Sequence, residues 1–310
     1  MNTAARAIIA EFSVSPVSVI APTVSVVMVV YHTGPSLDRS IRCVLDEPLA
    51  DELIIVDNGS SPEVAEQLRA LGRSEPRVVL LQGHGNVGFA TGANMGVAAA
   101  HGDHLVFLNP DAFLQTGCID ALVSGLANQP TPTIVGACIL DPDGAEQRGG
   151  RRGEVSAWTT LLSLSRATRR FPQLGRYEIH REREAMPDGI VRMPTISGAC
   201  FAARRADFDI LGGFDEGYFL HVEDIDLCWR ARREGGAVLF QPLAKVVHLG
   251  HTSLTNPWRV EMHKGMGLVR FFLKRAETAS AYGLALLMAP LILVTAVARP
   301  VLWRLRGHRA

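Results

Sequence analysis

The sequence HLVFLNPDAFL, residues 104–114, indicates where a buried strand ends and where a carboxylate follows it. Its apolar residues predict a strand over 104–109 that is covered on both faces. Pro110 has no backbone N–H and restricts the preceding Asn109 to an extended conformation, so the ladder of hydrogen bonds ends there. Asp111 is therefore held just past the carboxyl end of a strand, where open α/β sheets bind ligands.

The segments before this stretch alternate between apolar, β-branched runs and stretches that can form helices. Strands and helices are expected in turn at residues 24–31, 35–46, 52–58, 62–71, 77–82 and 91–100. Such alternation predicts right-handed crossovers and an α/β fold, in which a mainly parallel sheet has helices on both faces. Five polar residues follow strand ends and are candidates for ligand binding: Tyr31, Asp57, Asn58, Asn86 and Asp111.

The second half of the chain is less regular. Residues 151–184 hold eight arginines against four acidic residues and predict an irregular or helical insertion. This insertion is either a solvated face or a lid that faces anionic groups on the acceptor side. A strand over 196–205, a helix over 223–234 and the strand-like segments AVLFQP and KVVHLGHTS complete the globular part.

The overall composition argues against several classes of protein. Among the 310 residues, Lys plus Arg equals Asp plus Glu at 31 each, so no global field points to a nucleic-acid partner. The five cysteines form no CxxC pair and indicate neither a disulfide framework nor a zinc site, which fits a reducing cytosol. Residues 1–22 are expected to be a flexible leader, because Glu11 interrupts any signal-like apolar run.

The C-terminal region carries a long apolar segment. Residues 279–298 hold no charge over twenty positions, about the length that crosses a hydrocarbon core. The alternative is a buried core helix, but soluble helices rarely continue this long without polar residues. We expect the segment to lie in the membrane or re-enter it at a kink near Pro290. A simple crossing would translocate the basic residues after it, which are Arg299, Arg304, Arg306 and Arg309.

The turn GHGNVG, residues 83–88, matches the G-x-G-x-x-G pattern and makes an NAD-dependent dehydrogenase an alternative. The pattern belongs after the first strand of a dinucleotide-binding fold, whereas here it follows the third expected strand. We therefore favour another role for these glycines. Gly85 and Gly88 permit close backbone approach, and Asn86 either binds a ligand or closes the turn.

Three acidic clusters are expected near one cleft: Asp57, Asp111 and the group in HVEDIDLCW. On a helix Glu223 and Asp226 share a face, whereas Asp224 points about 100° away from Glu223. We assign Asp226 the structural role of an acid at a helix N-terminus. The apolar approach YFLHV predicts a partly desolvated site for Asp224, in which a carboxylate becomes a better base.

Seven motifs in order resemble the family 2 inverting glycosyltransferases, especially their bacterial rhamnosyltransferase-like branch. The resemblance covers about residues 22–255. The motifs are VSVVMVVYH, IIVDNGSS, GNVGFATGANMG, FLNPDAF, SGACFAARR, GGFDEGYFLHVEDIDLCWRARREG and VVHLGHTS. Each motif alone is modest evidence for the family, but the seven motifs together in this order are specific to it.

The resemblance implies a GT-A fold, a nucleotide-diphosphate sugar donor and Mg²⁺ or Mn²⁺. Within NPD, Asp111 matches the metal-binding aspartate of the family's DxD motif, and Asn109 stands where the first aspartate would be. Asp57 looks like the acid that reads the nucleotide base. Asp224 matches the general base, with Glu223 beside it, and His248 matches a position near the metal or leaving group. We expect Tyr31, Asn86 and Asn109 to contact the donor, and give His251 a lesser part.

The expected function is transfer of L-rhamnose from dTDP-rhamnose to a lipid-linked saccharide in cell-envelope polysaccharide synthesis. It would take place at the cytoplasmic face of the bacterial inner membrane. A UDP-hexose, N-acetylhexosamine or galactofuranose donor remains open, and so does a non-catalytic sugar-binding relative. We expect a catalytic domain over 23–260, in which a nucleotide-binding half (23–140) precedes an acceptor half (141–260). A membrane-associated tail would cover 261–310.

Overall fold

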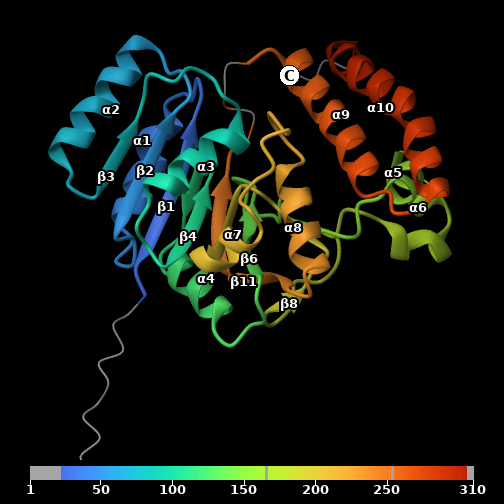
Figure 1. The fold of residues 1–310 in the computed structure, drawn as a ribbon, viewed down its shortest axis with the longest axis horizontal. Coiled ribbons are helices and arrows are strands. Elements are labelled where there is room, and N and C mark those ends of the chain that lie inside the picture. The colour runs from blue at the N-terminus through green and yellow to red at the C-terminus, as the bar shows by residue number, and fades with distance from the viewer. Residues whose placement is uncertain (1–21, 165–166, 251, 253–254, 306–310) are drawn as a thin grey trace, which may run out of the picture.

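The computed structural model describes residues 22–164, 167–250, 252 and 255–305 (Figure 1). Nearly all of the expected leader, and His251, lie outside these residues. The first half alternates as the sequence predicts. Its elements are β1 (Val24–Val30), α1 (Ser36–Leu45), β2 (Glu52–Asp57), α2 (Pro62–Ser74), β3 (Val78–Leu81), α3 (Phe89–Ala99) and β4 (His104–Leu108).

The second half departs from the prediction in several places. The run 196–205 is not one strand, because β9 and β10 belong to different sheets. The two last strand-like segments form one long strand, β11, with an irregular register between Gln241 and Lys245. The elements are β5 (Ala112–Leu114), α4 (Cys118–Leu126), β6 (Thr133–Leu140), β7 (Arg151–Arg152), α5 (Ala157–Leu164), α6 (Ala167–Arg170), η1 (Pro172–Tyr177), β8 (Val191–Arg192), β9 (Thr195–Ile196), β10 (Cys200–Arg204), α7 (Arg205–Ile210), α8 (Glu223–Arg233) and β11 (Ala237–His248).

The main sheet has the strand order β3-β2-β1-β4-β10-β6-β11-β5, with β8 paired to β11. β1 runs parallel to β2 and β4, and β2 runs parallel to β3. β10 is antiparallel to both β4 and β6, so β6 and its parallel partner β11 point the same way as β1. The carboxyl ends of six strands therefore meet at one edge, which we call the carboxyl edge.

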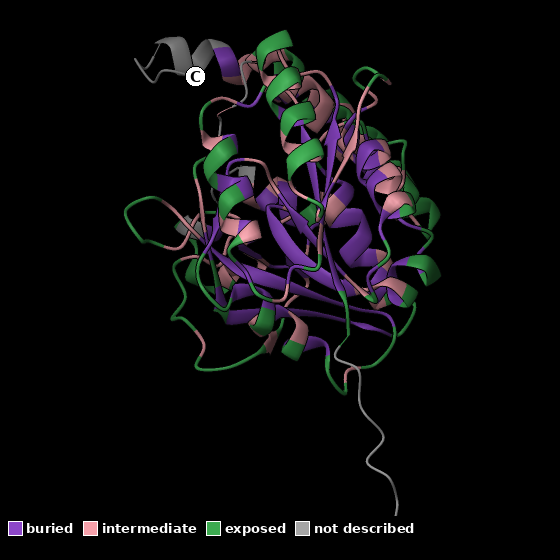
Figure 2. Cartoon of the chain, turned by 90° about the vertical axis from the view of Figure 1, so that its left-hand side faces the viewer, coloured by how far each residue is buried: buried purple, intermediate pink, exposed green. Residues whose placement is uncertain are grey.

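Two apolar layers cover the sheet, whose strands are almost entirely buried (Figure 2). One layer contains Leu37 of α1, Leu68 of α2 and Ile119 of α4. The other layer contains Ala93 of α3, Phe208 of α7 and Leu227 of α8. Strands buried on both faces explain why the sequence runs are continuously apolar rather than alternating.

Two helices, α9 (Pro257–Lys274) and α10 (Ala279–Leu305), follow the sheet and pack on each other (Figure 1). The side chain of Asn256 caps α9 by accepting from the Trp258 amide at 3.0 Å. A third apolar cluster joins them to the rest of the molecule through Tyr218, Trp229, Phe271 and Ile292. Because α9 already begins at Pro257, we propose that the tail starts near residue 256.

The apolar segment at 279–298 is helical, and α10 continues through both Pro290 and Pro300. Residues Ala279–Pro300 have a mean hydropathy of 2.2 over their most apolar window and are long enough to cross a membrane. Only 22% of that window is buried, which argues against a core helix. One face of α10 packs inward, while Leu287 and Val294 are 74% and 64% exposed.

Candidate functional site

The carboxyl edge gathers the residues that were predicted to bind a ligand. Tyr31 follows β1 and Asp57 ends β2, while Asn109 follows β4. Strand β5 pairs antiparallel with β11 so that Ala112 lies opposite His248. This pairing places the end of β11 beside Asp111, although 137 positions separate the two residues.

Asp111 and His248 form a pair of potential metal ligands at this edge. Their Oδ1 and Nε2 atoms lie 3.1 Å apart, and Thr252 donates a hydrogen bond to the other carboxylate oxygen at 2.9 Å. Burial by itself would raise the pKa of the Asp111 carboxyl, but the hydrogen bonds from His248 and Thr252 hold that pKa below its usual value. Asp111 is therefore an ionised oxygen donor at neutral pH.

A glutamine determines which nitrogen of His248 carries a proton. Gln147 Nε2 donates to Asp141 Oδ1 at 2.7 Å and to the His248 carbonyl at 3.0 Å. Its Oε1, 2.7 Å from His248 Nδ1, must then accept, so the hydrogen-bond network assigns a proton to Nδ1. A doubly protonated ring donates from Nε2 to Asp111 Oδ1, which is the hydrogen bond that lowers the Asp111 pKa. In the neutral ring the Nε2 lone pair faces Oδ1 instead, as in two ligands that share one cation.

The donor set fits a divalent metal that is bound together with a diphosphate. Within the described ranges, no group of three or more His, Cys, Asp or Glu residues could hold a metal ion. Asp111 and His248 thus offer two ligands, and Asn109, whose Nδ2 lies 3.3 Å from His248 Nε2, borders them. Mg²⁺ commonly takes only one or two protein carboxylates beside phosphate oxygens and water.

Asp224 lies in the first turn of α8 and is held by an arginine that sequence reasoning missed. Its Oδ2 accepts from Arg152 Nη2 and from the Gly198 amide at 3.0 Å, and Arg152 also donates to the Ile196 carbonyl at 2.7 Å. Burial would raise the pKa of the Asp224 carboxyl, but the charge and hydrogen bond of Arg152 hold that pKa below its usual value. The carboxylate stays ionised at neutral pH.

Two neighbouring peptide groups connect this carboxylate to the end of the edge where Asp111 and His248 lie. The Gly198 amide donates to Asp224, and the Ala199 carbonyl accepts from the Asn109 amide at 2.9 Å. A β-carbon at position 198 would lie 3.0 Å from that of Asp224, so a glycine allows the approach. Asp224 and the Asn109–Asp111 turn therefore flank the same short segment.

The other two acids of α8 have different environments. Burial raises the pKa of Glu223 to about 8, with a further contribution from the charge of Asp224, and Glu223 Oε2 has no hydrogen-bond partner among the described residues. Asp226 is fully buried and pairs with Arg230 at 2.7 Å and Lys274 at 2.8 Å. Its predicted role was structural, and it joins α8 to α9, whereas the acid that accepts from a first-turn amide of α8 is Asp224, which takes the Ile225 N–H at 2.8 Å.

The turn after β2 uses most of the hydrogen-bonding capacity of Asp57. Its Oδ1 accepts from the amides of Gly59 (3.0 Å) and Ser60 (2.8 Å), and its Oδ2 accepts from Gln82 Nε2 at 2.7 Å. A carboxylate can accept about four hydrogen bonds, so one position on Oδ2 is left for a ligand. Tyr31, half-buried, packs its ring against that of His32 nearby.

The glycine turn at 83–88 packs against the loop that precedes α8. The Asn86 side chain accepts from the Gly88 amide at 3.1 Å, so it closes the turn, the second of the two roles predicted for it. Gly88 has φ +86°, and a β-carbon there would lie 2.6 Å from the Phe219 carbonyl oxygen. The Phe89 amide donates to that same oxygen at 2.8 Å. Gly88 thus serves the contact between the two halves, whereas a β-carbon at Gly85 would meet nothing within 4 Å, so the close approach expected there is not found.

Comparison with known proteins places the chain in a family. The sequence model of the family described as "Glycosyl transferase family 2" matches residues 25–210. An N-acetylglucosaminyl-diphospho-decaprenol L-rhamnosyltransferase of Mycobacterium tuberculosis is 31% identical over 256 residues, which cover 72% of this chain and 75% of that protein. The chain belongs to glycosyl transferase family 2.

Solved structures place this family 2 glycosyltransferase in the GT-A fold. The mannosyltransferase PcManGT of Pyrobaculum calidifontis, in complex with GDP-Man and Mn²⁺, has a TM-score of 0.58 at 19% identity and covers 91% of this chain and 75% of its own. GalNAc-T7 with UDP, GalNAc and Mn²⁺ has a TM-score of 0.57 at 21% identity. The match covers 76% of this chain and 45% of GalNAc-T7. The resemblance drawn from the motifs is confirmed, and the dehydrogenase alternative finds no support.

Three polar residues of this glycosyltransferase site were not predicted from its sequence: Gln147, Arg152 and Thr252. The arginine-rich composition of 151–184 pointed to the right region, but gave no reason to single out Arg152. Neighbouring Arg151 instead makes a buried ion pair with Glu146 at 2.6 Å. Gln147 and Thr252 carried no signal, because their roles depend on partners more than 100 positions away.

Proposed function

We propose that this enzyme is an inverting transferase that moves L-rhamnose from dTDP-L-rhamnose to a lipid-linked saccharide. The observation that carries the proposal is the short segment Gly198–Ala199, which Asp224 and the Asn109–Asp111 turn flank at the carboxyl edge. Such an arrangement would hold a base and a diphosphate-binding pair on either side of the place where a sugar would be transferred. The 31% identity to the mycobacterial rhamnosyltransferase supports the choice of donor sugar.

The donor diphosphate would lie against Asp111 and His248. A divalent cation, Mg²⁺ or Mn²⁺, would be held there by these two side chains and would offset the charge of the departing diphosphate. Asn109 is placed to donate a hydrogen bond to a phosphate oxygen. Asp57 and Tyr31, at the ends of β2 and β1, would hold the nucleotide base through the remaining acceptor position of Asp57 and the flat face of the tyrosine. Asn86 would shape this side of the site rather than bind the donor.

Asp224 would accept the proton of the acceptor hydroxyl as that oxygen attacks the anomeric carbon from the face opposite the diphosphate. Its Oδ1 accepts from the Ile225 amide at 2.8 Å, and a carboxylate oxygen has a second acceptor position that the hydroxyl would use. Arg152 would keep the carboxylate charged and oriented. Glu223, buried and with a pKa raised to about 8, is mostly protonated at neutral pH and would support the site rather than act as the base.

The acceptor would reach the site from a membrane. The exposed apolar residues of α10 favour attachment to a lipid surface. The relative's name specifies a decaprenol-linked acceptor, which such attachment would bring within reach. We infer an acceptor that is a saccharide on a polyprenyl diphosphate, used at the cytoplasmic face.

A panel of nucleotide sugars tests the proposal directly. The purified protein would be given dTDP-rhamnose, UDP-hexoses, UDP-N-acetylhexosamines and UDP-galactofuranose, each with an N-acetylglucosaminyl-diphospholipid and Mn²⁺. We expect product to form only with dTDP-rhamnose, or to form by far fastest with it. The anomeric configuration of the product should be inverted relative to the donor. Faster transfer from any other donor, or retention of configuration, contradicts the proposal.

A further inference from the structure

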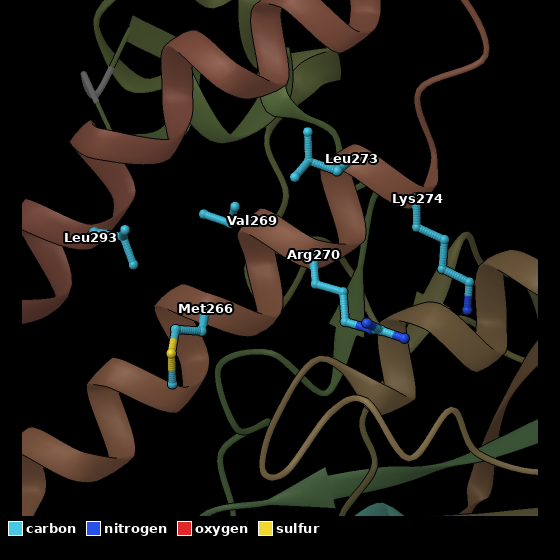
Figure 3. A pocket seen from close by; sticks show the side chains of 6 residues that line it. All are labelled: Met266, Val269, Arg270, Leu273, Lys274 and Leu293. Atoms are coloured by element: carbon cyan, nitrogen blue, oxygen red, sulfur yellow. The ribbon is translucent and has the colours of Figure 1, made fainter.

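A groove of about 660 Å³ lies along α9 and is bordered by α10 (Figure 3). Apolar side chains make most of its wall, and two cationic side chains extend from α9 away from α10 at its other side. Its lining residues are Met266, Val269, Arg270, Leu273, Lys274 and Leu293. The groove does not belong to the donor site, which lies at the carboxyl edge of the sheet.

The cationic side of the groove is formed by two side chains that are ion-paired but partly exposed. Asp215 pairs with Arg270 at 2.9 Å and with Lys274 at 2.7 Å. Buried Asp226 pairs with the same lysine at 2.8 Å and with Arg230 at 2.7 Å. Arg230 lies outside the groove, where it donates to the carbonyls of Leu211 and Gly213, so the two groove cations face two carboxylates. The Arg270 and Lys274 side chains are still 48% and 30% exposed, and a phosphate group at this side would be attracted to both.

This cationic side is close to the candidate base. Lys274 contacts Asp226, which lies two residues after Asp224 in the first turn of α8. The two aspartates face different sides of α8, whose diameter with side chains is roughly 10 Å. The cationic side of the groove and the candidate base therefore lie on two sides of the first turn of α8.

The apolar side of the groove continues into an exposed stripe on α10. Leu286, Leu293 and Val297 follow one another at helical spacings of seven and four, and the first and last are 51% and 42% exposed. Met266 on α9 is also exposed across the groove. A contiguous apolar surface of this kind is typical of a lipid-binding or membrane-binding face.

We propose that the α9–α10 groove binds the isoprenoid chain of the lipid-linked acceptor, with its phosphate near Arg270 and Lys274. This inference rests on the proposed function for the identity of the acceptor. The groove supplies an apolar channel, and the cationic side supplies the charge complement of a phosphate. A polyprenyl diphosphate combines both properties in one molecule, and its sugar would extend toward Asp224.

The chain-binding part is tested by filling the groove. Val269→Trp and Leu293→Trp place a bulky side chain in it, and Leu287→Trp, on the exposed face of the same helix, is the matched control. KM would be measured for two acceptors with one headgroup, one carrying a long isoprenoid chain and one a short, monomerically soluble chain. We expect KM to rise about tenfold or more for the long-chain acceptor only, and only in the two groove variants.

The phosphate-binding part is tested without turnover, so that a wrong donor or acceptor cannot be mistaken for a wrong groove. Titration of polyprenyl diphosphate into detergent-solubilised protein should show binding that Arg270→Gln weakens at least about fivefold. Arg233→Gln, another exposed arginine in an ion pair, should leave the affinity unchanged. Binding of the uncharged polyprenol should be insensitive to both substitutions.

Several results would overturn the inference. Equal KM changes for long- and short-chain acceptors would show that the groove does not hold the chain. Loss of vesicle binding in the groove variants, with normal KM in detergent, would assign the groove to bulk lipid. A change from dimer to monomer in those variants would assign it to a second copy of the chain. If the tryptophan variants do not fold, an unaltered affinity of Arg270→Gln for polyprenyl diphosphate is sufficient to reject the proposal.

Discussion

Arg152 is the side chain on which the chemistry of Asp224 most depends. It supplies both the charge and the hydrogen bond that keep the pKa of the Asp224 carboxyl below its usual value. The other ionisable groups that face this carboxylate are Glu223 and His221. Glu223 is mostly neutral at pH 7. A base with a depressed pKa loses its charge only when the solution becomes distinctly acidic.

Replacing Arg152 should therefore move the pH dependence of turnover in a known direction. In Arg152→Gln the pKa of Asp224 rises, so the acid-side fall of kcat should shift to higher pH. Arg152→Lys should return the profile part of the way toward that of the unaltered enzyme. Arg148→Gln, which removes a surface arginine at 4.0 Å from Glu182, is the control. An acid limb that stays in place in Arg152→Gln would show that the arginine does not act on the base.

Gln147 should affect metal affinity without touching the metal. It holds the proton on His248 Nδ1, which leaves Nε2 free to bind a cation. Removing such an outer hydrogen bond typically costs about 10- to 100-fold in metal affinity. Gln147→Leu should raise the Mn²⁺ concentration for half-maximal activity by that factor, whereas Gln67→Leu on the exposed surface of α2 should not. An unchanged metal requirement would remove His248 from the metal site.

At the scale of elements, the sequence predicted strands from continuous apolar runs and helices from amphipathic patterns. It did not predict elements that are stabilised mainly by tertiary contacts. The apolar runs that became β1, β2 and β4 are continuous because both faces are buried. Helix α9 was missed, since Gly265 and Gly267 weaken its helical signal. Both glycines lie where α9 meets other elements: a β-carbon would be 3.0 Å from Ala296 at the first and from Val222 at the second.

Helix α10 should bind membranes through its outer face. Cutting it off would expose the face of α9 that it covers, so substitution is the cleaner test. The double variant Leu287→Glu/Val294→Glu places two charges on the exposed face and should reduce binding to anionic vesicles by about tenfold or more. The melting temperature should change little, because both side chains are exposed.

A matched control uses an exposed apolar residue elsewhere. Ile210 at the end of α7 is 58% exposed, and Ile210→Glu should leave vesicle binding unaltered. Vesicle binding that survives the double α10 variant would contradict membrane attachment through this helix.

At the scale of the whole molecule, both halves of the chain contribute side chains to the candidate site. The first half brings Asp57 and Asp111 to the carboxyl edge, and the second brings Arg152, Asp224 and His248. The motifs predicted the carboxylates and His248 because each follows a recognisable strand or precedes a helix. They could not predict that Arg152 contacts a residue 72 positions away, or Gln147 one 101 positions away. Such contacts arise only when the halves pack together.

We predict that metal-dependent binding of the nucleotide sugar requires Asp111. Asp111→Asn removes the ionised oxygen donor of the pair with His248, so binding of the nucleotide sugar should lose its dependence on Mn²⁺ and weaken. Chelation of divalent metal by EDTA should have the same effect on the unaltered enzyme and little effect on the variant. Titration calorimetry with and without Mn²⁺ measures both, and an intact metal dependence in Asp111→Asn would exclude this carboxylate as a ligand.

The most direct test of the account compares turnover with donor binding in Asp224→Asn. This substitution keeps the shape of the side chain but removes the base, and general-base assistance is typically worth about 10² to 10⁴ in rate. We expect kcat to fall by that factor while metal-dependent donor affinity and melting temperature stay near their normal values, and Glu223→Gln to lose much less activity. A folded, donor-binding Asp224→Asn enzyme with near-normal kcat, or a larger loss in Glu223→Gln, would contradict the assignment of Asp224 as the base.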